Sequence, residues 1–227
     1  MTGSLGVMFD LVITGGTVID GTGTPGVRAD VGVADGRIAA VGDLAGAEAV
    51  ETVDATDKVV CPGFVDPHTH YDAQIFWDPW ATPSSLHGVT SLVMGNCGFS
   101  LAPIGDESDA AYIGAMMVKV EGMSPAALEI GVDWDWRSTA DYLDRLDGNI
   151  GVNVAAMVGH CALRRTVMKD DAVGREATDA EVAEMQHLLH LGLEAGGLGF
   201  STSRSFTHTD GDGVPIPSRV SADDEVV

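Results

Sequence analysis

The chain has 227 residues, enough to bury one large core or two small ones, and 45% of them are hydrophobic, an ordinary share for a globular protein. Its net charge of −22, from 34 acids against 12 Lys and Arg, argues against nucleic-acid and anionic-membrane partners, which need a basic surface. Three widely spaced cysteines, the lack of a long apolar run and the lack of a secretory pattern together predict a cytoplasmic location.

Residues 1–60 are expected to form a small β unit. The stretch "DLVITGGTVID" predicts a pair of strands interrupted by Gly-Gly. The stretch "RADVGVADGRIAAVGD" alternates around Asp35-Gly36, and Asp-Gly between two alternating runs is a strong hairpin signal.

From Val59 onward, apolar strands alternate with helices. The strands expected are "VVCPGFVDPH", "GVTSLVMGNCG", "NIGVNVAAMVGH" and "GGLGFSTS". The helices expected lie around 110–120, 138–146 and 178–195, the last with a capping-box spacing between Thr178 and Glu181. Continuous apolar strands are typical of parallel sheets buried on both faces. Residues 61–227 are therefore predicted to be α/β, as half of a β/α barrel or a small doubly wound sheet.

Polar or metal-binding side chains lie at the end of each of these strands. His68 and His70 close the first, Cys97 the second, His160 the third, and Ser201–Arg204 the fourth. Sites in parallel β/α folds lie at the carboxyl ends of the strands, so these side chains are candidates for a common site.

His68 and His70 are one residue apart on a strand, so both side chains point to the same face and can reach one metal ion. Imidazole and thiolate are preferred zinc ligands. Cys61 lies in an apolar run and is expected to be a small buried residue. Cys97 lies just past a strand, where the chain turns toward the expected site, and Cys161 remains a second candidate.

The segments "GFVDPHTHYD" and "GVTSLVMGNCGFSLAP" resemble the amidohydrolase superfamily and, through "GNCG", its N-acyl-D-amino-acid deacylase (D-aminoacylase) family. The segments "DLVITGGTVIDGTG", "GHCALR" and "GGLGFSTSRSFTH" are similar to the same family. The resemblance implies part of a small β-sandwich followed by the first half of a TIM-like (β/α)8 metal-dependent hydrolase barrel.

The resemblance also implies one or two zinc ions, with His68, His70 and Cys97 as ligands. Cys97 matches a cysteine whose sulfur can bridge two metal positions. Many other superfamily members use a carboxylated lysine at the end of strand four as the bridge, and "GGLGFSTS" has none. That absence favours Cys97 over Cys161.

The implied reaction is hydrolysis of an N-acyl-D-amino acid to a carboxylate and a free D-amino acid. Ring opening of a cyclic amide or imide is the alternative within the same superfamily, and a catalytically inactive fragment or scaffold subunit is the alternative outside enzymes. Two further histidine ligands and the general-base aspartate are implied to lie beyond residue 227, since a full barrel takes about 250 residues. A second polypeptide, a C-terminal segment or oligomerisation is expected to complete the barrel.

Four more residues are candidates for contact with the substrate or with the ligands. Asp66 can orient a ligand, or simply accept backbone hydrogen bonds at the strand end. His160 can line the site or be a structural histidine. Arg164 and Arg204 can hold a substrate carboxylate, although most arginines are exposed, and exposure is the expectation for both.

Overall fold

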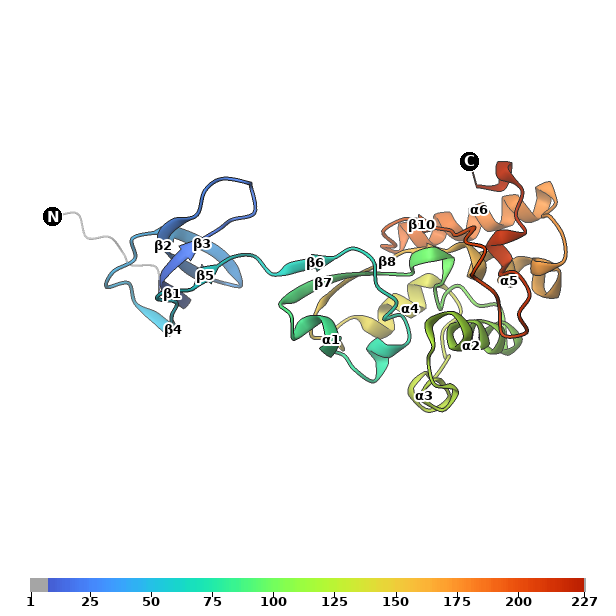
Figure 1. The fold of residues 1–227 in the computed structure, drawn as a ribbon, viewed down its shortest axis with the longest axis horizontal. Coiled ribbons are helices and arrows are strands. Elements are labelled where there is room, and N and C mark those ends of the chain that lie inside the picture. The colour runs from blue at the N-terminus through green and yellow to red at the C-terminus, as the bar shows by residue number, and fades with distance from the viewer. Residues whose placement is uncertain (1–7, 227) are drawn as a thin grey trace. The chain divides into compact units, whose positions relative to one another are not determined.

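The computed structural model describes residues 8–226 and divides into two compact units, the first ending at Gly63 and the second beginning at Phe64 (Figure 1). Among the described residues, none of the helices combines the length and apolar character needed to cross a membrane.

The first unit is a single five-stranded sheet. Its strands are β1 (Phe9–Val18), β2 (Val27–Ala34), β3 (Arg37–Gly42), β4 (Ala49–Asp54) and β5 (Val59–Val60). The order is β3-β2-β1-β4, and β5 also pairs with β1. The β2–β3 hairpin turns at Asp35 and Gly36, whose φ angles of 52° and 68° are those of the left-handed turn that Asp-Gly favours. The hairpin predicted from the sequence is confirmed.

The Gly-Gly break does not divide β1 into two strands. Strand β1 continues to Val18 with an irregular register between Ile13 and Gly16 against β2. Gly15, at a φ of 70°, absorbs the extra residue because a left-handed conformation costs glycine nothing. The prediction of a strand pair was wrong because the same glycine signal fits a bulge and a turn.

The run "VVCPGFVDPH" is two short strands instead of one. Strand β5 pairs with β1 in the first unit, whereas β6 (Phe64–Asp66) pairs with β7 (Val89–Met94) in the second. Pro62 lies between them and cannot donate a ladder hydrogen bond, so the run breaks there. Cys61 is consequently exposed, and its predicted burial was wrong.

The second unit contains parallel strands joined by helices, so the fold is mixed α/β, as the sequence predicted. Strands β6, β7 and β8 (Asn153–Ala156) form one parallel sheet in that order, and β9 (Val158–Gly159) pairs in parallel with β10 (Phe200–Ser201) (Figure 1). The two short sheets are linked where Val158 N donates to Gly199 O and Leu198 N donates to Ala156 O, each at 2.8 Å.

The helices of this unit are α1 (Thr82–Ser85), α2 (Glu107–Glu121), α3 (Pro125–Gly131), α4 (Thr139–Leu146), α5 (His160–Met168) and α6 (Asp179–Glu194). The capping box at the start of α6, between Thr178 and Glu181, is present as predicted, and α4 has one between Ser138 and Asp141. Helix α5 was not predicted, because the strand pattern was extended to His160, which is instead the first helical residue.

The core of the second unit lies between β7 and the helices that follow it. Leu92 and Met94 of β7 are buried in the same cluster as Ile113 and Met116 of α2, with Trp136 among them. This packing fixes α2 against the sheet, which brings the carboxyl end of that helix to the strand ends described next.

Candidate metal centre

The His-x-His segment leaves β6 and is anchored to β7 by the residue between the two histidines. Thr69 N donates to Val93 O at 3.0 Å, and its hydroxyl donates to the same oxygen at 2.7 Å. Because Thr69 is buried against β7, His68 and His70 both project away from that contact, with ring centroids 5.3 Å apart. Asp66 Oδ1 accepts a hydrogen bond from His68 N at 3.3 Å, the backbone role that the sequence had left open for it.

Cys97 lies in a tight turn that follows β7. Gly95, Cys97 and Gly98 have φ angles of 73°, 57° and 85°. A Cβ on Gly95 would lie 2.2 Å from Met157 O, so only glycine fits there. The left-handed conformation costs a non-glycine residue such as Cys97 roughly 1–2 kcal/mol, and strain of this kind clusters at functional sites.

The Asn96 side chain joins these two segments. Its Nδ2 donates to Thr69 O at 3.2 Å and to Val93 O at 2.9 Å. One amide therefore ties the backbone between the histidines to the turn that carries the cysteine. This contact is invisible in the sequence, since it joins residues 27 positions apart.

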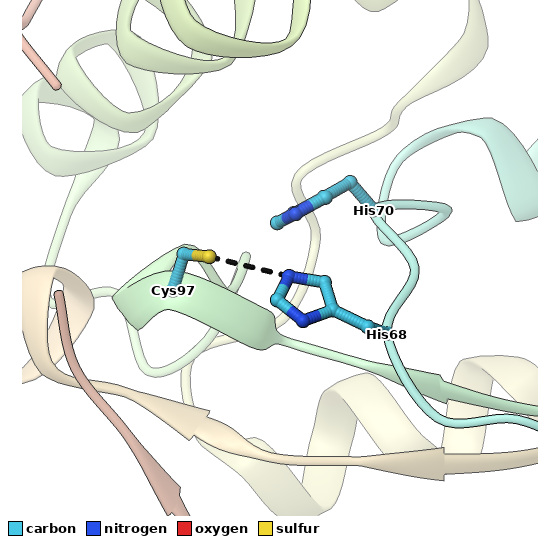
Figure 2. A group of neighbouring side chains, drawn as sticks. All are labelled: His68, His70 and Cys97. Carbon is cyan, nitrogen blue, oxygen red and sulfur yellow. Dashed lines mark hydrogen bonds between the residues drawn. The ribbon is translucent and has the colours of Figure 1, made fainter. Parts of the chain in front are cut away.

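Figure 2 shows His68, His70 and Cys97 pointing toward one another. One ligand atom from each of the three lies within 4.8 Å of those of the other two, and His68 Nε2 is 3.3 Å from Cys97 Sγ. We call these three residues the ligand cluster. His68 is exposed, while His70 and Cys97 are partly buried, so the cluster is open to solvent on one side.

The surroundings of the ligand cluster shift the pKa values of His70 and Cys97. Burial, with smaller contributions from His68 and His208, lowers the pKa of His70 to about 4. Burial and then the Glu121 carboxylate raise the pKa of Cys97 above its ordinary value. Without a cation, these residues are therefore a neutral imidazole and a thiol at pH 7, and a coordinated thiol loses its proton.

Glu121, the last residue of α2, was not singled out by the sequence. Its Oε1 lies 3.4 Å from His70 Nδ1, but no hydrogen bond forms, and Nδ1 is a buried nitrogen without a hydrogen-bond partner in the described part of the chain. Burial raises the pKa of Glu121. Its proximity depends on the packing of α2 against the sheet, so a sequence pattern offers no signal for it. A carboxylate beside a ligating histidine commonly orients the ring.

The Asp72 side chain holds the start of the turn that carries Cys97. Its carboxylate is fully buried, and Oδ2 accepts a hydrogen bond from Gly95 N at 3.1 Å, while Oδ1 has no partner among the described residues. Burial raises the pKa of Asp72 to about 7, against the opposing effect of the Gly95 hydrogen bond.

A cavity of about 380 Å³ adjoins His70. Its walls come from the end of α2 and from the loop after β10, and they are lined by His70, Lys119, Val120, Glu121, Thr207, His208 and Thr209. The fold places His208, from the loop after β10, in the same cavity wall as His70.

Two of the other candidates, His160 and Arg164, belong to a separate buried cluster with Glu225. His160 Nε2 lies 2.7 Å from Glu225 Oε1, and Arg164 Nη1 donates to Glu225 Oε1 at 2.6 Å. The remaining donors of Arg164 bond to the carbonyls of Ala172 and Arg175. We call His160, Arg164 and Glu225 the ion-pair cluster. The expected exposure of Arg164 was wrong, because its side chain is 0% exposed.

The last two candidates, Arg204 and Cys161, differ in their exposure to solvent. Arg204 is exposed and pairs with Asp223, whose side chain is itself exposed, and it also donates to Ser221 O at 3.1 Å. Cys161 is fully buried, its Sγ lies 3.4 Å from Ser218 Oγ, and burial raises its pKa to about 11. Cys161 is not part of the ligand cluster.

The donor set fits zinc. Tetrahedral zinc with bonds of about 2.1 Å to nitrogen and 2.3 Å to sulfur separates such donors by about 3.6 Å. The 3.3 Å between His68 Nε2 and Cys97 Sγ is close to that separation.

Comparison with known proteins places the chain in one family. The amidohydrolase family profile matches residues 51–226. D-aminoacylase of Alcaligenes xylosoxydans xylosoxydans is 44% identical over 195 residues, which cover 86% of this chain and 37% of that enzyme.

Two solved structures share the fold. A structure of D-aminoacylase, described with a binuclear metal centre, superposes with a TM-score of 0.76 at 40% identity and covers 96% of this chain and 41% of its own. N-acyl-D-glutamate deacylase from Bordetella bronchiseptica, complexed with zinc and a phosphonate inhibitor, has a TM-score of 0.77 at 36% identity and covers 97% of this chain and 42% of its own.

The chain belongs to the amidohydrolase family. Within it, the resemblance to D-aminoacylase and the N-acyl-D-amino-acid deacylases, inferred from the motifs, is confirmed. The chain spans 37% of the length of the D-aminoacylase that it matches.

Proposed function

We propose that this chain supplies zinc ligands to a hydrolase that converts an N-acyl-D-amino acid to a carboxylate and a free D-amino acid. The observation that carries the proposal is the convergence of His68, His70 and Cys97 at the strand ends. The similarity to D-aminoacylase, and to a deacylase structure that contains zinc, supports the substrate class and the metal.

One or two zinc ions, when bound, would lower the pKa of a water toward about 7 and polarise the amide carbonyl. His70 and Cys97 of this chain can both take the protonation state that binds zinc. His70 is held neutral by burial, which is the state that coordinates metal. Cys97 would give up its proton on coordination and contribute a negative charge. The aspartate that exchanges the proton with water and the leaving amine is proposed to lie outside the described residues.

The architecture proposed for the whole protein is a (β/α)8 barrel beside a small β-sandwich. Residues 61–227 would be the first four β/α units of the barrel, and residues 1–60 part of the sandwich. The parallel pairing of β6, β7 and β8 and of β9 and β10 supports this assignment. A segment or second polypeptide outside the described residues would complete the barrel and add ligands.

Different roles are proposed for the remaining candidates. Asp66 would support the His68 backbone that it already contacts. Arg204 is the arginine proposed to meet a substrate carboxylate, because it is exposed and its partner Asp223 is exposed as well. Arg164 and His160 are proposed to act through Glu225 as a structural unit. The cytoplasmic location expected from the cysteine usage is retained as part of this proposal.

Native mass spectrometry read for polypeptides and zinc together tests the proposal. We expect zinc in the wild type, alone or with a second polypeptide, and much less zinc in Cys97→Ser. The zinc-loaded material should then hydrolyse N-acetyl-D-amino acids and leave the L-enantiomers. Equal zinc in both proteins, or an assembled zinc protein without D-deacylase activity, would contradict the proposal.

A further inference from the structure

A single hydroxyl from the end of β10 holds both ends of the turn that carries Cys97. Ser201 Oγ donates a hydrogen bond to Gly95 O, the first residue of the turn. The same oxygen accepts a hydrogen bond from Gly98 N, the last residue, at 3.0 Å. Ser201 is 7% exposed, so water does not compete freely for these bonds.

The turn needs such support from outside itself. Three of its four residues are left-handed, and Cys97 is the one that is not glycine. The backbone of the turn is closed by a hydrogen bond from Phe99 N to Asn96 O at 2.8 Å. A strained conformation persists when its surroundings determine it. Asp72 and Asn96 hold the start of the turn, whereas Ser201 is the residue that spans its two ends.

We propose that Ser201 is a positioning residue that fixes the direction of the Cys97 thiol toward His68 and His70. The hydroxyl closes the distance between Gly95 O and Gly98 N and so sets the backbone angles at Cys97, which lies between them. The inference rests on the proposed role of Cys97 as a metal ligand. Ser201 itself touches neither metal nor substrate in this role.

Removal of the hydroxyl in the 227-residue chain, with Co²⁺ as the probe, tests this role. A cysteine thiolate bound to Co²⁺ gives a charge-transfer absorption that reports the sulfur directly. We expect Ser201→Ala to weaken Co²⁺ binding about 10- to 100-fold, the usual effect of losing a residue that supports a ligand, and to weaken this absorption. Ser201→Thr retains the hydroxyl and should recover both.

Ser218→Ala is the matched control. Ser218 is also a buried serine whose hydroxyl donates to a backbone oxygen, Ser203 O at 2.7 Å, but it does not bond to the Cys97 turn. We expect its Co²⁺ affinity and absorption to match those of the wild type. An equal loss in Ser218→Ala, or wild-type binding in Ser201→Ala, would overturn the proposal.

Hydrogen exchange of the Gly98 amide in the metal-free protein tests the bridge without a metal. Loss of one net hydrogen bond of about 1 kcal/mol predicts exchange about fivefold faster in Ser201→Ala. Unchanged exchange would overturn the role of Ser201 even if Co²⁺ binds. A wild type that lacks the thiolate absorption would instead contradict metal binding by Cys97 in this chain alone, and the Gly98 amide would still decide whether Ser201 holds the turn.

Discussion

Two polar clusters at the strand ends of the second unit differ in how their groups are satisfied. In the ion-pair cluster, Glu225 meets both Arg164 and His160, and the second ring nitrogen of His160 is 2.9 Å from Thr202 Oγ1. In the ligand cluster, His70 Nδ1 has no hydrogen-bond partner between residues 8 and 226, and His68 Nε2 lies 3.3 Å from Cys97 Sγ. Buried polar groups with a structural role are normally paired within the protein, so the cluster that keeps an unpaired nitrogen among the described residues is the one that we propose for ligand binding.

The ion-pair cluster predicts the largest change in stability. Glu225→Gln leaves the fully buried Arg164 guanidinium without its counter-charge, which should lower the free energy of unfolding by about 3–5 kcal/mol. Urea denaturation measures this change. The double variant Arg164→Met, Glu225→Leu should recover much of the loss, because no charge is then left buried. A double variant as unstable as the single one would contradict the ion-pair explanation.

The ligand cluster predicts the opposite pattern, a loss of metal with little loss of fold. Cys97→Ser removes a ligand and should weaken Zn²⁺ binding by more than about 100-fold, beyond the effect of losing a supporting residue. Competition with a zinc chelator measures the affinity. Cys61→Ser is the matched control, since Cys61 is exposed and lies outside the cluster. If Cys61→Ser loses as much zinc, the thiol of the site has been assigned to the wrong residue.

Each cluster has a carboxylate beside a histidine ring nitrogen: Glu225 beside His160 in the ion-pair cluster, and Glu121 beside His70 in the ligand cluster. With zinc bound through Nε2 of His70, the Nδ1–H group would donate a hydrogen bond to Glu121 and so satisfy the unpaired nitrogen. Glu121→Gln should then weaken Zn²⁺ binding about tenfold. Glu107→Gln, at the other end of α2, is the control and should leave the affinity unchanged. Equal affinities for wild type and Glu121→Gln would show that the 3.4 Å contact does not orient His70.

The pH dependence of stability gives the smallest expected effect. Burial would raise the pKa of Glu225, but hydrogen bonds from His160 and Arg164 outweigh it and hold the pKa below its ordinary value. The unfolded carboxyl therefore takes up its proton first as the pH falls below about 4.3, and the free energy of unfolding decreases there. Denaturation between pH 6 and pH 3 should show a steeper decline for the wild type than for Glu225→Gln. Parallel curves would contradict the shifted pKa.

Much of this organisation could be inferred from local signals. The Asp35-Gly36 hairpin and the capping box at Thr178 depend on residues close in sequence, and both are present. The secondary-structure prediction was wrong where one sequence pattern is compatible with two structures. Gly15-Gly16 became a bulge, and the apolar run around Pro62 became strands of two different units. Arg164 is buried because it pairs with Glu225, and no local pattern could predict that pairing, since Glu225 lies 61 positions away.

The sequence by itself determined which residues have the chemistry to bind zinc and which strand ends carry them. The spacing of His68 and His70 predicts a common face if the chain is extended. In the structure β6 ends at Asp66, and the bonds of Thr69 to Val93 O are what hold the segment between the two histidines. Only the tertiary structure decided that Cys97, and not Cys161, lies beside them, and that Asn96, Ser201 and Glu121 surround the three. Those contacts join segments separated by 27 to 106 residues, and the packing of strands and helices brings them together.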